Sequence, residues 1–132
     1  MAHSFSSLDE LGEGPGFRKV RSSMGISAFG VNGVVYPPGQ EGFAHYHDTQ
    51  DELYFVHSGT ARFEVDGEER LVGPGGLLHV ESTTPRKVSN AGEDDLVMLI
   101  VGGHGGYVER DGQLIDAADL ARRQSFGKET RS

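Results

Sequence analysis

The sequence predicts an all-β domain, a sandwich or barrel of short strands, on three observations. Apolar residues alternate with polar ones or form short runs, as in half-buried and buried strands. Turn-forming residues interrupt these segments every six to twelve residues, and the chain holds 20 glycines and 5 prolines. No helical periodicity is found before residue 113. Short strands separated by regular turns are typical of sandwiches and barrels.

Length and charge limit the function classes. A chain of 132 residues is expected to form one domain. Its net charge is −8 without a basic stripe, which argues against nucleic acid and anionic membranes as partners. There is no run of 18 apolar residues and no signal-peptide pattern, so a cytoplasmic protein is expected. The absence of cysteine excludes disulfides and thiolate metal ligands.

The first part of the chain is expected to be an arm followed by a strand. In residues 1–16, Ser7 to Glu10 fits a capping box, but nearby glycines end any helix within a turn. From Phe17 to Tyr36 the pattern becomes strand-like, and Pro37 to Gly39 ends it.

The middle of the chain is expected to supply the other strands. Ala61, Phe63 and Val65 alternate with charged residues and should face the core. Asp66-Gly67 is a strong hairpin signal. The expected strands are Phe43 to His47, Glu52 to His57, Thr60 to Val65, Arg70 to Val72, Leu77 to Val80, Arg86 to Ser89 and Leu96 to Val101.

The barrel domain is expected to cover residues 17–101 and a C-terminal extension residues 102–132. Gly102 to Gly106 is interpreted as a flexible break between them. Asp116 to Gln124 is predicted to form one short helix, with Asp116 as its N-cap.

Two histidines and a glutamate form a candidate metal site. His45 and His47 lie one residue apart on an expected strand, so both imidazoles point to the same face. A turn, Asp48 to Asp51, would return the chain with Glu52 at the start of the next strand. Two imidazoles and one carboxylate are typical of a divalent-metal site.

This stretch resembles the first signature motif of the cupin family. The motif is glycine, five residues, His-x-His, four residues, glutamate, six residues and glycine. Every fixed position is matched, by Gly39, His45, His47, Glu52 and Gly59. The resemblance covers roughly residues 17–101 and implies a double-stranded β-helix (jelly-roll) barrel. It also implies that the two histidines and the glutamate hold a divalent transition metal such as Fe, Mn, Ni or Zn.

The second cupin motif supplies a fourth ligand, a histidine, and here two registers compete. In the first, Gly75 leads the motif, Arg86 takes the histidine position and Asn90 the asparagine position. In the second, His79 takes the histidine position. The second register leaves too few residues for the hairpin that should follow the first motif, so the first is favoured.

An arginine at the ligand position leaves two interpretations open. Guanidinium has no free lone pair and stays charged, so Arg86 does not ligate a metal. In one, the three other residues hold the metal and Arg86 clamps an anionic substrate. Alternatively, Arg86 replaces the metal and pairs with Glu52.

Two further residues are candidates for substrate binding. Tyr54 shares strand parity with Glu52 and should face the same cavity, where an ordinary core role is the competing interpretation. His79 lies on the strand that enters the Arg86 loop, and is a candidate for lining the pocket.

The resemblance implies a metal-binding protein that acts on a small, anionic molecule as an oxygenase, isomerase or lyase. The alternative is a metal-free protein that binds or senses a small molecule, with Arg86 paired to Glu52. A homodimer is expected, because cupins commonly pair and an exposed sheet edge accepts a strand from a second copy. The fold does not determine the reaction.

Overall fold

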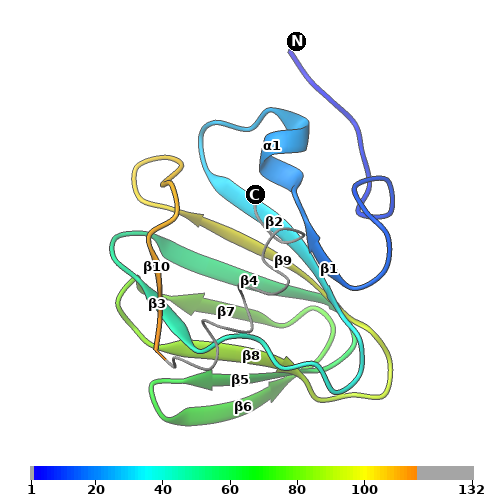
Figure 1. The fold of residues 1–132 in the computed structure, drawn as a ribbon, viewed down its shortest axis with the longest axis vertical. Helices are drawn as coiled ribbons and strands as arrows, with labels where there is room; N and C mark the ends of the chain where they lie inside the picture. The colour runs from blue at the N-terminus through cyan, green and yellow to red at the C-terminus, as the bar shows by residue number, and fades with distance from the viewer. Residues whose placement is uncertain (1, 116–132) are drawn as a thin grey trace.

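Two antiparallel five-stranded sheets form the protein in the computed structural model, which describes residues 2–115 (Figure 1). The first sheet contains, in spatial order, β1 (Gly16–Arg18), β2 (Gly30–Tyr36), β9 (Leu96–Gly103), β4 (Asp51–Ser58) and β7 (Leu77–Val80). The second contains β10 (Gly112–Leu114), β3 (His45–His47), β8 (Arg86–Asn90), β5 (Ala61–Val65) and β6 (Glu68–Val72). The chain therefore crosses repeatedly between the sheets, as in a jelly roll, and the all-β prediction is confirmed.

The core lies between the two inner faces. Leu96, Met98 and Val34 from the first sheet are fully buried, and Ala61 and Phe63 from the second pack into the same cluster. These positions follow the alternation of each strand, so the period-two pattern places one face of each sheet inward.

The hairpin between β5 and β6 confirms the Asp66-Gly67 turn. Both residues have positive φ, 50° and 84°, as a tight two-residue hairpin requires. This hairpin occupies the residues between the two motifs, as the first of the two registers requires.

A short helix, α1 (Val20–Met24), interrupts the region predicted as one strand from Phe17 to Tyr36. The expectation of no helix before residue 113 was therefore wrong. Val20 and Met24 are four residues apart, which suits one face of a helical turn. Gly25 ends the helix at φ 73°, where its N–H donates to the carbonyl of Arg21. No helix within residues 2–115 has the length and apolar character needed to cross a membrane.

The N-terminal arm is held against the first sheet. Arg18 donates hydrogen bonds to the carbonyls of Leu8 (3.1 Å) and Gly14 (2.7 Å). A Cβ at Gly33 would lie 2.6 Å from the Leu8 side chain, so the absence of a side chain there allows the arm to approach. β1 pairs with β2 of the same chain and covers that sheet edge.

The chain beyond β9 returns to the second sheet as β10, which pairs with β3. Gly112 lies opposite His47 in this register, so the segment reaches the candidate metal residues. The predicted helix from Asp116 to Gln124 lies outside the described residues.

Leu96→Ala is expected to lower the free energy of unfolding by about 2–5 kcal/mol, because it leaves a cavity between the sheets. Urea denaturation monitored by circular dichroism measures this loss. Leu71→Ala is the matched control, because that side chain is 61% exposed and should change stability by no more than about 0.5 kcal/mol. Equal effects of the two substitutions would contradict the assignment of the core.

Candidate metal centre

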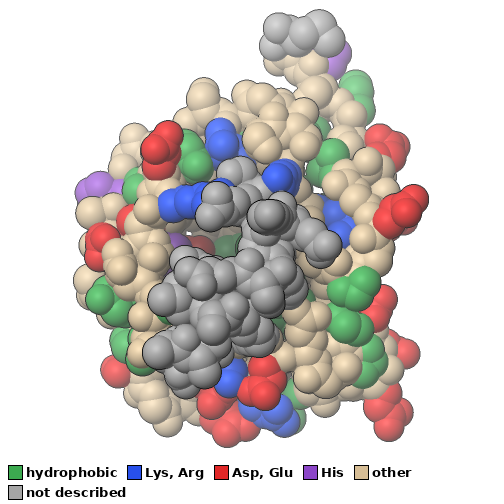
Figure 2. Space-filling view, viewed as in Figure 1, with side chains coloured by type: hydrophobic (Ala, Val, Ile, Leu, Met, Phe, Trp, Pro, Cys, Tyr) green, Lys and Arg blue, Asp and Glu red, His purple; other side chains and the backbone are tan. Residues whose placement is uncertain are grey.

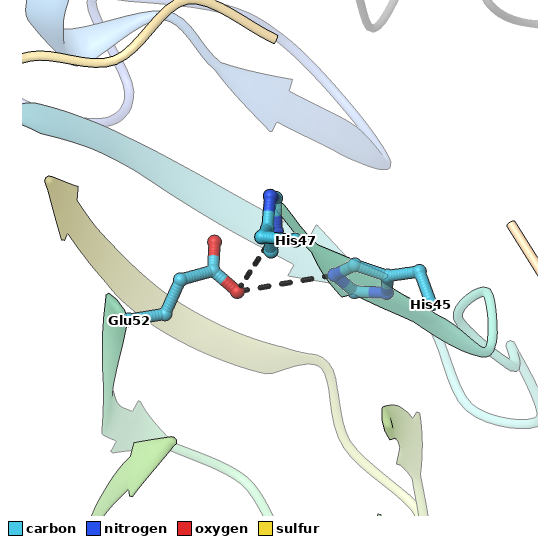
Figure 3. A group of neighbouring side chains, drawn as sticks. All are labelled: His45, His47 and Glu52. Carbon is cyan, nitrogen blue, oxygen red and sulfur yellow. Dashed lines mark ion pairs between the residues drawn. The ribbon is translucent and has the colours of Figure 1, made fainter. Parts of the chain in front are cut away.

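The structure brings together the three residues that the first motif predicts as metal ligands (Figure 3). His45 and His47 project from β3 in one sheet, and Glu52 projects from β4 in the other. The Nε2 atom of His47 lies 3.3 Å from Oε1 of Glu52, and that of His45 lies 3.8 Å away. One ligand atom from each residue can be chosen so that all three lie within 4.8 Å of one another.

Both imidazoles are held through their Nδ1 atoms. His47 Nδ1 is 2.8 Å from a carboxylate oxygen of Asp111, and His45 Nδ1 is 2.9 Å from the carbonyl of Phe43. Because these partners are acceptors, each Nδ1 donates its proton to its partner, which leaves each Nε2 facing Glu52 as the ring atom that could ligate a metal. This is the arrangement in which metal-binding histidines are usually oriented.

The Nε2 atom of His47 is buried and has no hydrogen-bond partner among the described residues. A buried polar atom without a partner is destabilising, so such atoms are rare in folded proteins. A metal ion between His45, His47 and Glu52 would use this lone pair, and the donor set of two nitrogens and one oxygen fits a divalent transition metal.

A cavity of about 230 Å³ adjoins the three residues, whose side chains form part of its wall. The surface drawn in Figure 2 has a hollow, and atoms of His and of acidic side chains are visible inside it. The other described residues that line the cavity are Phe17, Arg21, Gly30, Val31, Asn32, Tyr36, Phe43, Gln50, Tyr54, Val88, Ile100, Gly102, Tyr107, Val108 and Arg110.

The sequence profile of the Cupin domain family matches residues 33–102, more than half of the chain. The chain belongs to the cupin family. The match contains the complete first motif from Gly39 to Gly59 and the candidate fourth-ligand position, Arg86.

Three individual comparisons agree with this assignment. An uncharacterised protein of Methanocaldococcus jannaschii is 29% identical over 66 residues, which are 50% of this chain and about half (53%) of that relative. The crystal structure of a cupin protein from Bacteroides fragilis is similar with a TM-score of 0.68 at 21% identity, covering 83% of this chain and 91% of that one. A sugar phosphate isomerase of the cupin superfamily from Silicibacter pomeroyi is similar with a TM-score of 0.62 at 27% identity, covering 67% and 58%.

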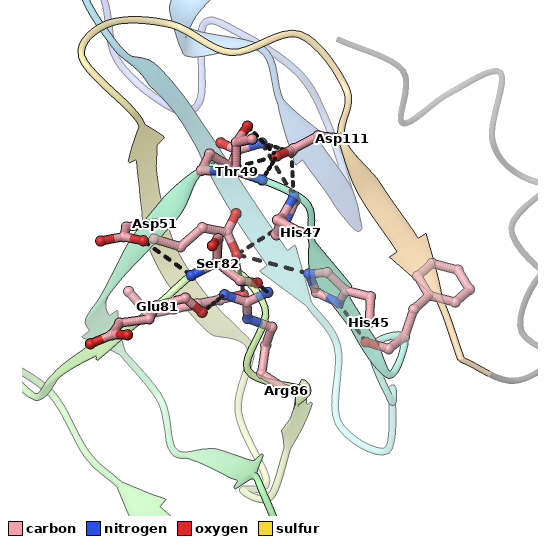
Figure 4. A network of polar contacts seen from close by, with 12 residues as sticks. His45, His47, Thr49, Asp51, Glu81, Ser82, Arg86 and Asp111 are labelled. Carbon is pink, nitrogen blue, oxygen red and sulfur yellow. Dashed lines mark hydrogen bonds and ion pairs between the residues drawn. The ribbon is translucent and has the colours of Figure 1, made fainter.

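In this cupin, Arg86 lies directly opposite His45 in the pairing of β3 with β8. Its Nη1 and Nη2 atoms donate hydrogen bonds to the carbonyls of Ser82 and Glu81, both at 3.1 Å (Figure 4). The side chain is 1% exposed and is not among the residues that line the cavity. The structure therefore places Arg86 beside the metal residues, with the ends of its guanidinium turned to the backbone.

The asparagine of the second motif has a structural role. Asn90 is buried, and its side-chain amide donates to the carbonyls of Tyr36 (2.9 Å) and Asp94 (2.8 Å). Asn90 therefore connects β8 to β2 of the other sheet and to the turn before β9. This role supports the register of the second motif in which Gly75 is the first glycine and Asn90 takes the asparagine position.

Glu52 is an ionised carboxylate with several polar neighbours. Burial alone would raise the pKa of Glu52, but the neighbouring imidazoles of His45 and His47 outweigh burial and hold that pKa well below its usual range. The hydroxyl of Tyr54 also donates to Oε1 at 2.8 Å. Burial and the charge of Glu52 raise the pKa of Tyr54, so its hydroxyl keeps its proton. Tyr54 therefore orients Glu52 and lines the cavity.

His79 lies away from the cavity. It is on the outer face of β7, is 60% exposed, and has its Nε2 atom 3.5 Å from Asp51. Its neighbours Leu78 and Val80 point inward, so strand alternation turns His79 to solvent.

Asp111 is a site residue that the sequence interpretation missed. One carboxylate oxygen accepts from His47 and from the Gln50 side chain (2.6 Å), and the other accepts from the backbone N–H groups of Thr49 (2.7 Å) and Gln50 (2.9 Å) and from the Thr49 hydroxyl. Burial would raise the pKa of Asp111, but these donors outweigh it and lower that pKa. Asp111 and His47 are 64 positions apart in the sequence, which explains why no local pattern indicated the pair.

Two carboxylates flank the ring of His47. Burial would lower the pKa of His47, but Glu52 and Asp111 together outweigh burial and raise it. The carboxylate of Asp111 fixes the orientation of the ring, and the carboxylate of Glu52 lies with the ring at the candidate metal position. Gly112 allows this packing, because a Cβ there would lie 3.3 Å from the His47 ring.

Asp111→Asn is expected to weaken metal binding by about 10–100-fold, the usual effect of losing a carboxylate that orients a ligating histidine. An amide also places N–H donors against the N–H groups of Thr49 and Gln50. Competition for Zn²⁺ with a chromophoric chelator measures the affinity. Glu93→Gln, on an exposed turn, removes the same charge and should leave the affinity unchanged. Unaltered Zn²⁺ affinity in Asp111→Asn would show that Asp111 does not position His47.

Proposed function

We propose that this cupin binds one divalent transition metal through His45, His47 and Glu52 and acts on a small anionic molecule in the adjoining cavity. The observation that carries the proposal is the orientation of the two imidazoles. Each is held by its Nδ1 atom and presents Nε2 toward Glu52, and the Nε2 atom of His47 is buried without a hydrogen-bond partner among the described residues.

The separations of the donor atoms support this assignment. Two donors about 2.1 Å from one ion lie about 3.0–3.4 Å apart in octahedral or tetrahedral arrangements. His47 Nε2 and Glu52 Oε1 are 3.3 Å apart, and His45 needs only a small adjustment from 3.8 Å.

The expected chemistry follows from three protein ligands and an adjoining cavity. A bound metal would supply a Lewis acid or a site for O₂ chemistry, with positions left for substrate oxygens. Fe, Mn, Ni and Zn all accept two nitrogens and one oxygen. The protein's residues orient the ligands through Phe43, Asp111 and Tyr54.

The class of reaction is an oxygenase, isomerase or lyase reaction on a small acid. The Silicibacter pomeroyi neighbour is named a sugar phosphate isomerase, which supports a small anionic substrate. Because cupin barrels host unrelated reactions, the proposal extends to the ligand class and the metal but not to a single reaction.

A metal-free binding protein is the second candidate, and the position of Arg86 favours it. Its Nε atom is 3.9 Å from Oε1 of Glu52 and has no hydrogen-bond partner among the described residues. A fixed guanidinium so near a buried carboxylate partly neutralises it, as a cation would. In this second candidate function, the pair of Arg86 and Glu52 takes the place of the metal.

The purified protein is expected to contain about one equivalent of metal after incubation with Zn²⁺ or Mn²⁺ and desalting, as measured by elemental analysis. His47→Ala should lose it, because one of three protein ligands is removed. His79→Ala is the matched control, since this histidine is exposed and outside the cavity. Chelation should lower the melting temperature of the wild-type protein and of His79→Ala but not that of His47→Ala. Substoichiometric metal that is the same in His47→Ala would refute the metal site.

Arg86→His is expected to raise the affinity for Zn²⁺ by at least about tenfold, because it removes a positive charge beside the site and adds an imidazole opposite His45. Arg62→His makes the same change on a half-exposed arginine of β5 and should have no effect. Calorimetric titration distinguishes the two candidates. A wild-type protein that binds no metal while Arg86→His binds it would favour the metal-free function.

A further inference from the structure

We propose that Arg21 and Arg110 bind the acidic group of the ligand, and that the ligand is a small hydroxylated acid with a carboxylate or phosphate end. This inference rests on the proposed function, since it names the ligand class of the same cavity. It transfers the anion-binding role from Arg86, whose guanidinium is buried and bonded to backbone carbonyls, to two arginines on the cavity wall.

The charge of the cavity wall is opposite to that of the protein. The chain carries a net charge of −8, yet among the described residues that line the cavity only Glu52 is acidic, whereas Arg21 and Arg110 are basic. Figure 2 shows Lys and Arg side chains gathered beside the hollow. A bound divalent ion would add further positive charge to the cavity, so the cavity is expected to attract an anion.

Arg21 is held in a fixed plane by its neighbours. Its guanidinium carbon lies 3.8 Å from the centre of the Tyr107 ring, and Nη1 lies 3.5 Å from the carbonyl of Ile26. A guanidinium carries five N–H donors in a rigid fork that matches carboxylate and phosphate oxygens. Stacking on Tyr107 therefore orders the group without using most of its donors.

Arg110 comes from a different segment, which is anchored to the metal residues. It directly precedes Asp111, whose carboxylate is bonded to His47 and to the backbone of Thr49 and Gln50. Tyr107 and Val108 of the same segment also line the cavity. The backbone of Arg110 is thereby fixed relative to His47, and its exposed side chain forms part of the same cavity wall.

Asn32 indicates that the ligand also carries a hydroxyl. It lies on β2 opposite Ile100 and lines the cavity. Its Oδ1 atom is buried and has no hydrogen-bond partner among residues 2–115. A rotation of the Asn32 side chain would bring this oxygen or the amide N–H to a ligand hydroxyl in the cavity. The volume, about 230 Å³, is below the roughly 300–1,000 Å³ typical of drug-sized ligands, so the ligand has few heavy atoms.

Calorimetric titration of the full-length, metal-loaded protein tests the inference with four probes. Glycerol phosphate and glycerate carry the two candidate acid groups, propyl phosphate lacks the hydroxyls, and glycerol lacks the acid. The wild-type protein is expected to bind both hydroxylated acids at millimolar concentration or below, and glycerol not at all. The tighter of the two acids identifies the group that the arginines prefer.

Arg21→Gln and Arg110→Gln should each weaken both acids by at least about tenfold, the usual effect of losing a charged hydrogen bond. Arg70→Gln is the matched control, because this arginine is 74% exposed on β6. The wild-type protein should bind glycerol phosphate more tightly than propyl phosphate, and Asn32→Leu should remove this preference, because it removes the partner of the hydroxyl.

The failure of this inference is distinguishable from failure of the metal site. If neither acid binds the wild-type protein, or if Arg21→Gln and Arg110→Gln bind them as tightly as wild type, the arginine site is refuted whatever the metal content. If elemental analysis finds no metal but binding of the acids still depends on both arginines, the metal function is refuted and the arginine site stands.

Discussion

The site depends above all on the Asp111 carboxylate. It accepts hydrogen bonds from His47, from the Gln50 side chain and from two backbone N–H groups of the turn that joins β3 to β4. Charge-assisted hydrogen bonds of this kind are stronger than neutral ones. One side chain thus fixes the tautomer of His47, the path of the turn and the attachment of β10 to the second sheet. The orientation of the metal residues and the position of Arg110 both follow from it.

Glu52 is the second constraint, because its buried carboxylate must be compensated. Oε1 lies near four groups, the imidazoles of His45 and His47, the hydroxyl of Tyr54 and the guanidinium of Arg86. A buried charge is tolerated only where partners replace its hydration. The guanidinium of Arg86 donates a hydrogen bond to the carbonyl of Ser82 and is not part of the cavity wall. Its positive charge nevertheless stabilises the Glu52 carboxylate. The arginine in the second motif is therefore compatible with a metal site built from three ligands.

The parts of the site that local spacing determines were predictable from the sequence. His45, His47 and Glu52 lie within eight residues of one another, so strand parity and one turn bring them together, and the hairpin between the motifs indicated the register of Arg86. Asp111 contacts His47 across 64 residues, and no local period marks such a pair. Helix α1 was missed because its five residues are too few for a clear helical period. The expectation that His79 lines the pocket was wrong. Its neighbours Leu78 and Val80 point inward, so strand alternation turns the His79 side chain outward.

The proposed anion site and the candidate metal centre share one structural element, the segment from Tyr107 to Gly112. Its Asp111 end orients His47, and its Tyr107 end stacks on Arg21, with Arg110 between them on the cavity wall. A metal on His47 would favour the position of the segment in which Asp111 is bonded, and an acid on the arginines would favour the same position. Because coupling between two binding events is reciprocal, each ligand would then strengthen the binding of the other. In the proposed site, the segment from Tyr107 to Gly112 would therefore connect the recognition of charge to the orientation of the metal ligands.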